Sequence, residues 1–133
     1  MRAVAWVGAV ISGASMIFIA SVEASLIRQW SQLIWLAVFL AWNCFPASVS
    51  IWVLFSPRLR TPVRFAGAVA FAITATLLPS LLHLAWATNW QGTATGSSTS
   101  GVAFVFIPGW SLVFGSAAAL VVCGIVLAIR SVR

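Results

Sequence analysis

Four long runs without a charged side chain constrain this sequence more than any other feature. The runs cover residues 3–22, 33–55, 65–87 and 102–129. A helix needs about 20 apolar residues to cross the hydrocarbon core of a bilayer, so each run is long enough for one membrane span. Strands of a membrane barrel would instead need segments of about ten residues with alternating polarity. The pattern predicts an all-α integral membrane protein, a four-transmembrane-helix bundle.

The composition excludes a water-soluble fold. Of 133 residues, 62% are hydrophobic and 6% are charged, whereas about 25% of the residues of an ordinary soluble domain are charged. So little polar surface cannot cover an apolar core in water. We therefore expect residues 1–133 to form a single membrane domain, with short loops at 23–32, 56–64 and 88–101.

The arginines predict an orientation in the membrane. The loop 56–64 and the C-terminal tail each carry several arginines, and the positive-inside rule places short basic segments of this kind in the cytoplasm. Four spans then place the N-terminus on the same side, which gives the N-in/C-in topology of a bacterial inner-membrane protein. The charge is divided among short segments that flank the membrane, so we expect anionic lipid headgroups to be its partners, and not nucleic acid. The predicted lipid contacts are Arg58, Arg60 and Arg64.

The first run has a second possible interpretation. Arg2, the apolar stretch and the residues Val22-Glu23-Ala24 before Ser25 imitate a cleavable secretory signal. The run is longer than the usual 7 to 15 residue core of a signal peptide, which favours a retained membrane helix. Cleavage would leave three spans in the same orientation.

Prolines mark irregular positions in three of the runs. Pro108 lies early in the fourth run, and proline is well tolerated in the first turn of a helix. We therefore expect a regular helix from about Pro108 to Arg130, with residues 101–107 as an apolar approach, a kinked first turn or an interfacial piece. Pro46 and Pro79 lie inside the second and third runs. Kinks there would free carbonyl groups that hydroxyls or neighbouring helices can satisfy.

Small and polar residues recur at helical spacing in every run. Helices in lipid associate through close backbone approach and through hydrogen bonds between them, so such stripes predict the faces that meet in the bundle. Packing is the preferred interpretation for most of these residues. The stripes are Gly8, Ser12, Ser15, Ile19 and Glu23; Asn43, Ala47 and Ser50; Ala72, Thr76, Ser80, His83 and Ala87; Ser111, Gly115, Ala118 and Val122.

Three polar residues are candidates for a functional role. Glu23 is the only acidic residue, and an acid in a membrane span is a functional candidate by default. Its place at the end of the first run predicts that it reaches headgroup water or pairs with Arg28. His83 is expected to hydrogen-bond to a neighbouring helix, because a lone histidine without paired cysteines or a nearby acid cannot complete a metal or haem site. Asn43 is expected to fix the register of its helix.

The tryptophans gather at the predicted outer end of the bundle. The chain has 8 tryptophans, and an aromatic belt at the headgroup level explains most of them. The outward bias goes beyond what a belt requires, so we also consider a partner or ligand surface at that end. The candidate residues for this polar or partner site are Glu23, Arg28, Asn43, Ser80, His83, Trp86, Trp90 and Trp110.

The sequence lacks the groups of residues that enzymatic catalysis usually requires. A single carboxylate cannot form the acid pair of a hydrolase, and no phosphate-binding or nucleophile-elbow motif is present. Cys44 and Cys123 each lie in an apolar run without a second cysteine at metal or redox spacing, so both are expected to be packing residues. We predict a protein that is not an enzyme and has no cofactor or metal.

Two functions agree with these observations. The first is a non-catalytic accessory, assembly or immunity protein that associates with another membrane component through helix faces or its outer end. The second is a small homo-oligomeric transporter or channel for a small solute or ion. In size and four-span layout the chain resembles the small multidrug transporters, whose essential Glu lies inside the first span. Here Glu23 stands at the end of its run, and no family is assigned.

Overall fold

Four helices make up the fold in the computed structural model, which describes residues 2–25, 33–59, 61–90 and 98–132. They are α1 (Arg2–Ala24), α2 (Leu33–Leu54), α3 (Pro62–Ala87) and α4 (Ser98–Ser131). The described residues contain no strand. All four helices are long and apolar enough to cross a membrane. This confirms the predicted helical class and the number of candidate spans.

The connection between α2 and α3 is shorter than predicted. Helix α3 begins at Pro62, three residues before the apolar run, because residues 61 and 62 form a strong helix start. The Thr61 backbone is extended, and its side-chain oxygen accepts a hydrogen bond from the Arg64 amide at 3.4 Å. Proline suits the first helical position, where no donor is needed. Hydrophobicity alone therefore misses the first turn of α3.

Helix α4 contradicts the prediction of a regular helix beginning near Pro108. It is helical from Ser98, so Pro108 lies in its interior. Two donors satisfy carbonyls in the turn that contains the proline. Ser111 Oγ donates to the Ile107 carbonyl at 2.7 Å, and Trp42 Nε1 on α2 donates to the Val105 carbonyl at 2.7 Å. Such donors let a membrane helix continue through a proline.

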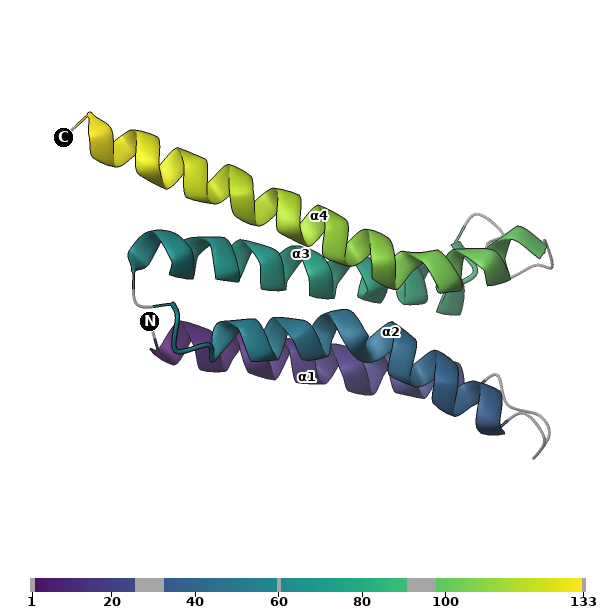
Figure 1. Cartoon of the computed structure of the whole chain (residues 1–133). Coiled ribbons are helices and arrows are strands. Elements are labelled where there is room, and N and C mark those ends of the chain that lie inside the picture. The colour runs from purple at the N-terminus through teal and green to yellow at the C-terminus, as the bar shows by residue number, and fades with distance from the viewer. Residues whose placement is uncertain (1, 26–32, 60, 91–97, 133) are drawn as a thin grey trace.

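Successive helices run in opposite directions, so α1 and α3 are parallel to each other (Figure 1). Helices α1, α2 and α3 contact one another, whereas α4 packs on α3 and α2 and makes no contact with α1 in the described residues. Towards its C-terminus α4 diverges from α3 (Figure 1). One end of the bundle holds the start of α1, the end of α4 and residues 55–59 and 61 (Figure 1). We call it the basic end because it carries Arg2, Arg58, Arg64 and Arg130.

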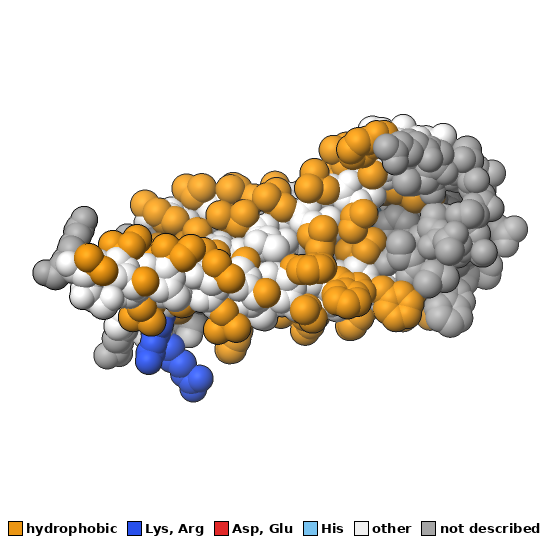
Figure 2. All heavy atoms as spheres, turned by 90° about the horizontal axis from the view of Figure 1, so that it is seen from above, with side chains coloured by type: hydrophobic (Ala, Val, Ile, Leu, Met, Phe, Trp, Pro, Cys, Tyr) orange, Lys and Arg blue, Asp and Glu red, His pale blue; other side chains and the backbone are white. Residues whose placement is uncertain are grey.

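Small side chains fill the helix interfaces, as the stripes predict. Ala47, Ala72, Ser12 and Ser111 are all buried, while Figure 2 shows hydrophobic side chains over much of the visible outer face and arginine near one end. This distribution suits a lipid solvent, in which bulky apolar groups gain little from burial. Ala87 and Ala118 do not fit their stripes, because they are exposed and half-buried.

Candidate functional site

The only acidic residue is buried inside the bundle, and not exposed to headgroup water. Glu23 lies in the last turn of α1 and is 6% exposed. The sequence predicted headgroup water or Arg28 as its surroundings, and Arg28 falls outside the described residues. The carboxylate instead faces α2 and α3. Its stripe on α1 explains this position, since Ser12, Ser15 and Ile19 on the same face are also buried.

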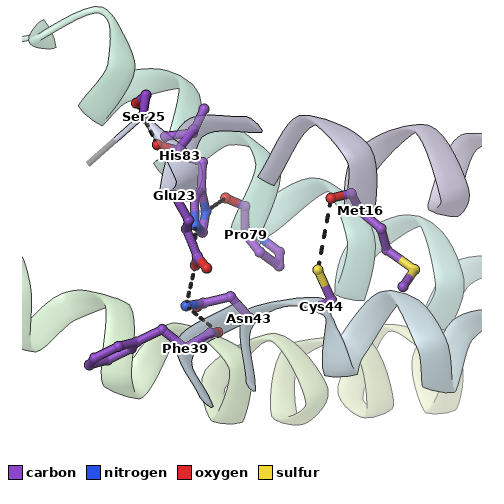
Figure 3. A network of polar contacts seen from close by, with 9 residues as sticks. Met16, Glu23, Ser25, Phe39, Asn43, Cys44, Pro79 and His83 are labelled. Carbon is purple, nitrogen blue, oxygen red and sulfur yellow. Dashed lines mark hydrogen bonds and ion pairs between the residues drawn. The ribbon is translucent and has the colours of Figure 1, made fainter. Parts of the chain in front are cut away.

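Glu23 forms a cluster with two other predicted residues, one from each neighbouring helix. Asn43 Nδ2 on α2 donates to Glu23 Oε1 at 2.7 Å, and His83 Nε2 on α3 lies 3.3 Å from the same oxygen. Figure 3 shows the three side chains pointing toward one another from three helices. His83 is fully buried and Asn43 is 1% exposed. The acid predicted to be remote from His83 is thus its direct neighbour.

Backbone carbonyls of the same helices hold the two partners of Glu23 in place. Asn43 Nδ2 also donates to the Phe39 carbonyl at 3.1 Å. His83 Nδ1 lies 2.8 Å from the Pro79 carbonyl. Each contact spans four residues, one helical turn, and so fixes the direction of the side chain. The side chains of Asn43 and His83 are therefore held in orientations that point toward the Glu23 carboxylate.

The hydrogen bonds of His83 restrict the protons of the cluster. A carbonyl oxygen only accepts, so the contact with Pro79 assigns a hydrogen to Nδ1. The contact between Nε2 and Glu23 Oε1 then needs one more hydrogen, carried either by the imidazole or by the carboxyl group. The pair is electrically neutral in both arrangements. A proton can therefore move between the two residues without changing the net charge of the cluster.

Two acceptor atoms of the cluster have no partner in the described part of the chain. They are Glu23 Oε2 and Asn43 Oδ1, and both are buried. A buried acceptor without a donor costs about 1–3 kcal/mol. Both atoms require the same kind of partner, a hydrogen-bond donor. The cluster is therefore suited to receive a proton or a small donor molecule.

Hydroxyl groups extend the cluster along the interface of α1, α2 and α3. Ser50 Oγ donates to the Pro46 carbonyl at 2.8 Å, and Thr76 Oγ1 donates to Ser50 Oγ at 3.4 Å. In the hydrogen bond of 3.2 Å between Ser12 and Thr76, Ser12 Oγ must then be the donor. We call these residues and the cluster the polar seam, which consists of Ser12, Ser15, Glu23, Asn43, Ser50, Thr76, Ser80 and His83.

Ser80 lies between the hydroxyl groups and the cluster along α3. Its Oγ donates to the Thr76 carbonyl at 2.8 Å, so the hydrogen bond between Ser15 and Ser80 uses the Ser15 hydrogen. Ser80 also lies three residues before His83, which places both on one face of α3. The sequence predicted Ser80 and His83 as candidates, and the structure brings them onto one continuous interface.

An apolar cluster separates the polar seam from the basic end. Ala5, Leu54 and Ala72 are buried together, and Phe65 and Val69 pack against them. Gly8 allows α1 to approach α2 closely here, because a Cβ atom at this position would lie 2.7 Å from Leu54 Cδ1. Side chains from three helices therefore lie between the seam and the basic end.

Those of the predicted tryptophans and arginines whose side chains the structure describes are more exposed than this cluster. Trp90 and Trp110 are 66% and 55% exposed, and Trp110 stacks on Phe114, with ring centroids 5.7 Å apart. Trp86 is half-buried. Arg58 and Arg64 are exposed at the basic end, while Arg60 lies outside the described residues. The candidate residues thus divide into a buried polar set and a surface set.

Sequence reasoning missed the contact between Glu23 and His83, although a signal for it existed. Helices α1 and α3 are parallel. Glu23 lies one residue before the end of α1, and His83 lies four residues before the end of α3. Residues at similar distances from the ends of parallel neighbours lie at similar depth. Applying this rule to the predicted spans would have paired the two residues.

The described residues contain no group of three or more His, Cys, Asp or Glu side chains that could hold a metal ion. Cys44 and Cys123 are free thiols. The Cys44 thiol approaches the Met16 carbonyl at 3.8 Å and the Cys123 thiol approaches the Val63 carbonyl at 3.5 Å, so both contact a neighbouring helix. No protein-family model, no curated protein and no solved structure matches this chain.

Proposed function

We propose that the chain is a small membrane transporter or channel, in which protons move along the polar seam between α1, α2 and α3. The observation that carries the proposal is the buried cluster of Glu23, Asn43 and His83. A neutral pair that can exchange a hydrogen internally suits proton transfer, and chains of acidic residues and histidines are the usual proton relays of membrane proteins.

The energetics of the cluster favour this function over a purely structural one. Replacing a buried ion pair by apolar residues of similar volume is often neutral or stabilising, so a buried pair is weak evidence for stability. A glutamine at position 23 would give Asn43 the same acceptor without a titratable group. The acceptors Glu23 Oε2 and Asn43 Oδ1 lower the stability further, because the described residues offer them no donor. A proton on Glu23 Oε2 would turn that acceptor into a donor.

Proton flux into liposomes tests the proposal. The purified chain is reconstituted with a pH-sensitive dye inside the vesicles, and the decay of an imposed pH step is measured. We expect faster decay than in protein-free vesicles, and we expect Glu23→Gln to slow the protein-dependent decay about ten-fold or more. Ser21→Ala is the matched control, because Ser21 is on the same helix, exposed, and bonded only to the Ile17 carbonyl among the described contacts.

Two outcomes would contradict the transport function. One is decay no faster than in protein-free vesicles, and the other is equal decay for the unmodified chain and Glu23→Gln. His83→Ala is a second test of the same path. It removes the imidazole that exchanges a proton with Glu23 and keeps the carboxylate.

A second candidate function is that of a non-catalytic accessory, assembly or immunity protein, and helix α4 supports it. Between Val105 and Ser131 only Ile107, Pro108, Ser111 and Gly115 are buried, whereas α3 buries seven residues. A second helix could approach it closely at Gly124, where a Cβ atom would meet nothing within 4 Å. A foreign membrane protein that co-purifies in stoichiometric amounts, together with absence of flux, would favour this function over transport.

We also propose that the basic end faces the cytoplasm, with the protein in a bacterial inner membrane. Arg2, Arg58, Arg64 and Arg130 lie at that end, in agreement with the positive-inside rule. A green fluorescent protein fused to the C-terminus should therefore fluoresce, and alkaline phosphatase fused there should remain inactive. The opposite pair of results would reverse the orientation.

A further inference from the structure

We propose that the basic end contains a binding site for one anionic phospholipid. A pocket of about 590 Å³ lies there between the first turns of α1, the end of α2 and the start of α3. One cation and several bulky apolar side chains line it. The residues that carry the inference are Arg2, Trp6, Phe55, Leu59 and Phe65.

The charge of the chain requires an anion from outside at this end. The sequence has one acidic residue, and that residue, Glu23, is buried between Asn43 and His83 near the other end of α1. No acidic side chain remains for the arginines of the basic end. Arg2 is exposed beside the pocket, so its guanidinium is available to an external phosphate.

The position of Arg2 adds a second attraction for an anion. It is the first residue of α1, and the amide groups of a first helical turn have no carbonyl partners within the helix. They point outward and favour a phosphate group at the same place as the guanidinium. Ser56, which also lines the pocket, adds a hydroxyl that can bond to a headgroup.

The apolar walls favour a lipid over free phosphate. Trp6 and Phe55 pack edge to face, with ring centroids 5.0 Å apart and an angle of 70° between the rings. Both are exposed, at 63% and 45%. An acyl chain can lie against these rings while its phosphate meets Arg2. Indole rings are enriched at this level of a membrane protein for the same reason, since they pair an apolar surface with a donor.

This site is independent of the proposed transport function, because none of its residues belongs to the polar seam. It also differs from the contacts predicted for Arg58, Arg60 and Arg64. Those arginines lie in or beside the connection between α2 and α3, whereas Arg2 and Trp6 come from α1.

Native mass spectrometry of the full chain tests the site. The protein in a neutral detergent is titrated with phosphatidylglycerol or with phosphatidylcholine of the same acyl chains. We expect one phosphatidylglycerol to be retained in preference to phosphatidylcholine. Arg2→Gln should weaken retention of phosphatidylglycerol about five-fold, the factor that corresponds to about 1 kcal/mol for one arginine near an anionic surface.

Arg130→Gln is the matched control, because Arg130 lies at the same end but on α4 and does not line the pocket. We expect it to leave retention of phosphatidylglycerol nearly unchanged. An equal loss for both variants would indicate diffuse attraction to the basic end and would overturn the site. Equal retention of the two lipids, or full displacement by glycerol phosphate without acyl chains, would overturn it as well.

Discussion

Replacing His83 with leucine should lower the free energy of unfolding by about 3–5 kcal/mol, the usual cost of removing one partner from a buried charged pair. Glu23 would remain buried beside Asn43 without the hydrogen that His83 now shares with it. In the Glu23→Gln background the same substitution should cost only about 0.6–2 kcal/mol, the range for neutral hydrogen bonds between membrane helices. Glutamine carries no charge. Its side-chain amide can donate a hydrogen bond to Asn43 Oδ1.

The unmodified chain, His83→Leu, Glu23→Gln and the double variant form a double-mutant cycle. Their unfolding can be compared in mixed micelles of mild detergent and dodecyl sulfate, followed by far-ultraviolet circular dichroism. The difference between the two costs is the coupling free energy of the pair. Equal costs in both backgrounds would mean that Glu23 and His83 do not interact. That result would contradict the cluster without reference to any transport activity.

Gly67→Ala should destabilise the bundle by about 1–3 kcal/mol, the typical cost of overpacking a tight interface. A Cβ atom at Gly67 would lie 2.5 Å from Cys123 Sγ and 3.3 Å from the Ala119 carbonyl oxygen. Helix α3 would then have to move away from α4. The same unfolding measurement reports the loss.

Gly124→Ala is the matched control for this substitution. It makes the same chemical change inside α4, at a position where a Cβ atom would meet nothing within 4 Å. Alanine is favoured over glycine inside a helix by about 0.5–1 kcal/mol, so the control should be neutral or slightly stabilising. Adding Cys123→Ala to Gly67→Ala should recover part of the loss, because it removes the sulfur atom. Equal stability of the two glycine variants would contradict the close contact of α3 and α4.

Helical spacing in the sequence predicted which faces of the helices are buried. It could not predict which residues of different helices contact one another. Ser12 and Thr76 were placed on stripes of their own helices, and both are buried. Their hydrogen bond joins residues 64 positions apart, and no pattern within one helix contains that information. The same reason explains the error at Glu23, whose partners lie 20 and 60 positions away.

The helix ends depended on different chemistry from the spans. Charge-free runs predicted the apolar segments, whereas Thr61 and Pro62 set the start of α3 through capping. For α4 the expected start at Pro108 was wrong, because the helix begins at Ser98 and continues through the proline, where Ser111 and Trp42 donate to nearby carbonyls. The position of the proline alone therefore did not give the start of this helix.

The lack of contact between α1 and α4 has a consequence for biosynthesis. All hydrogen bonds described within the polar seam join α1, α2 and α3. Membrane helices insert first and associate afterwards, and chains emerge from the ribosome N-terminus first. The first three helices can therefore form the hydrogen bonds of the seam before the fourth enters the membrane. Helix α4 then joins a finished three-helix unit, chiefly along α3.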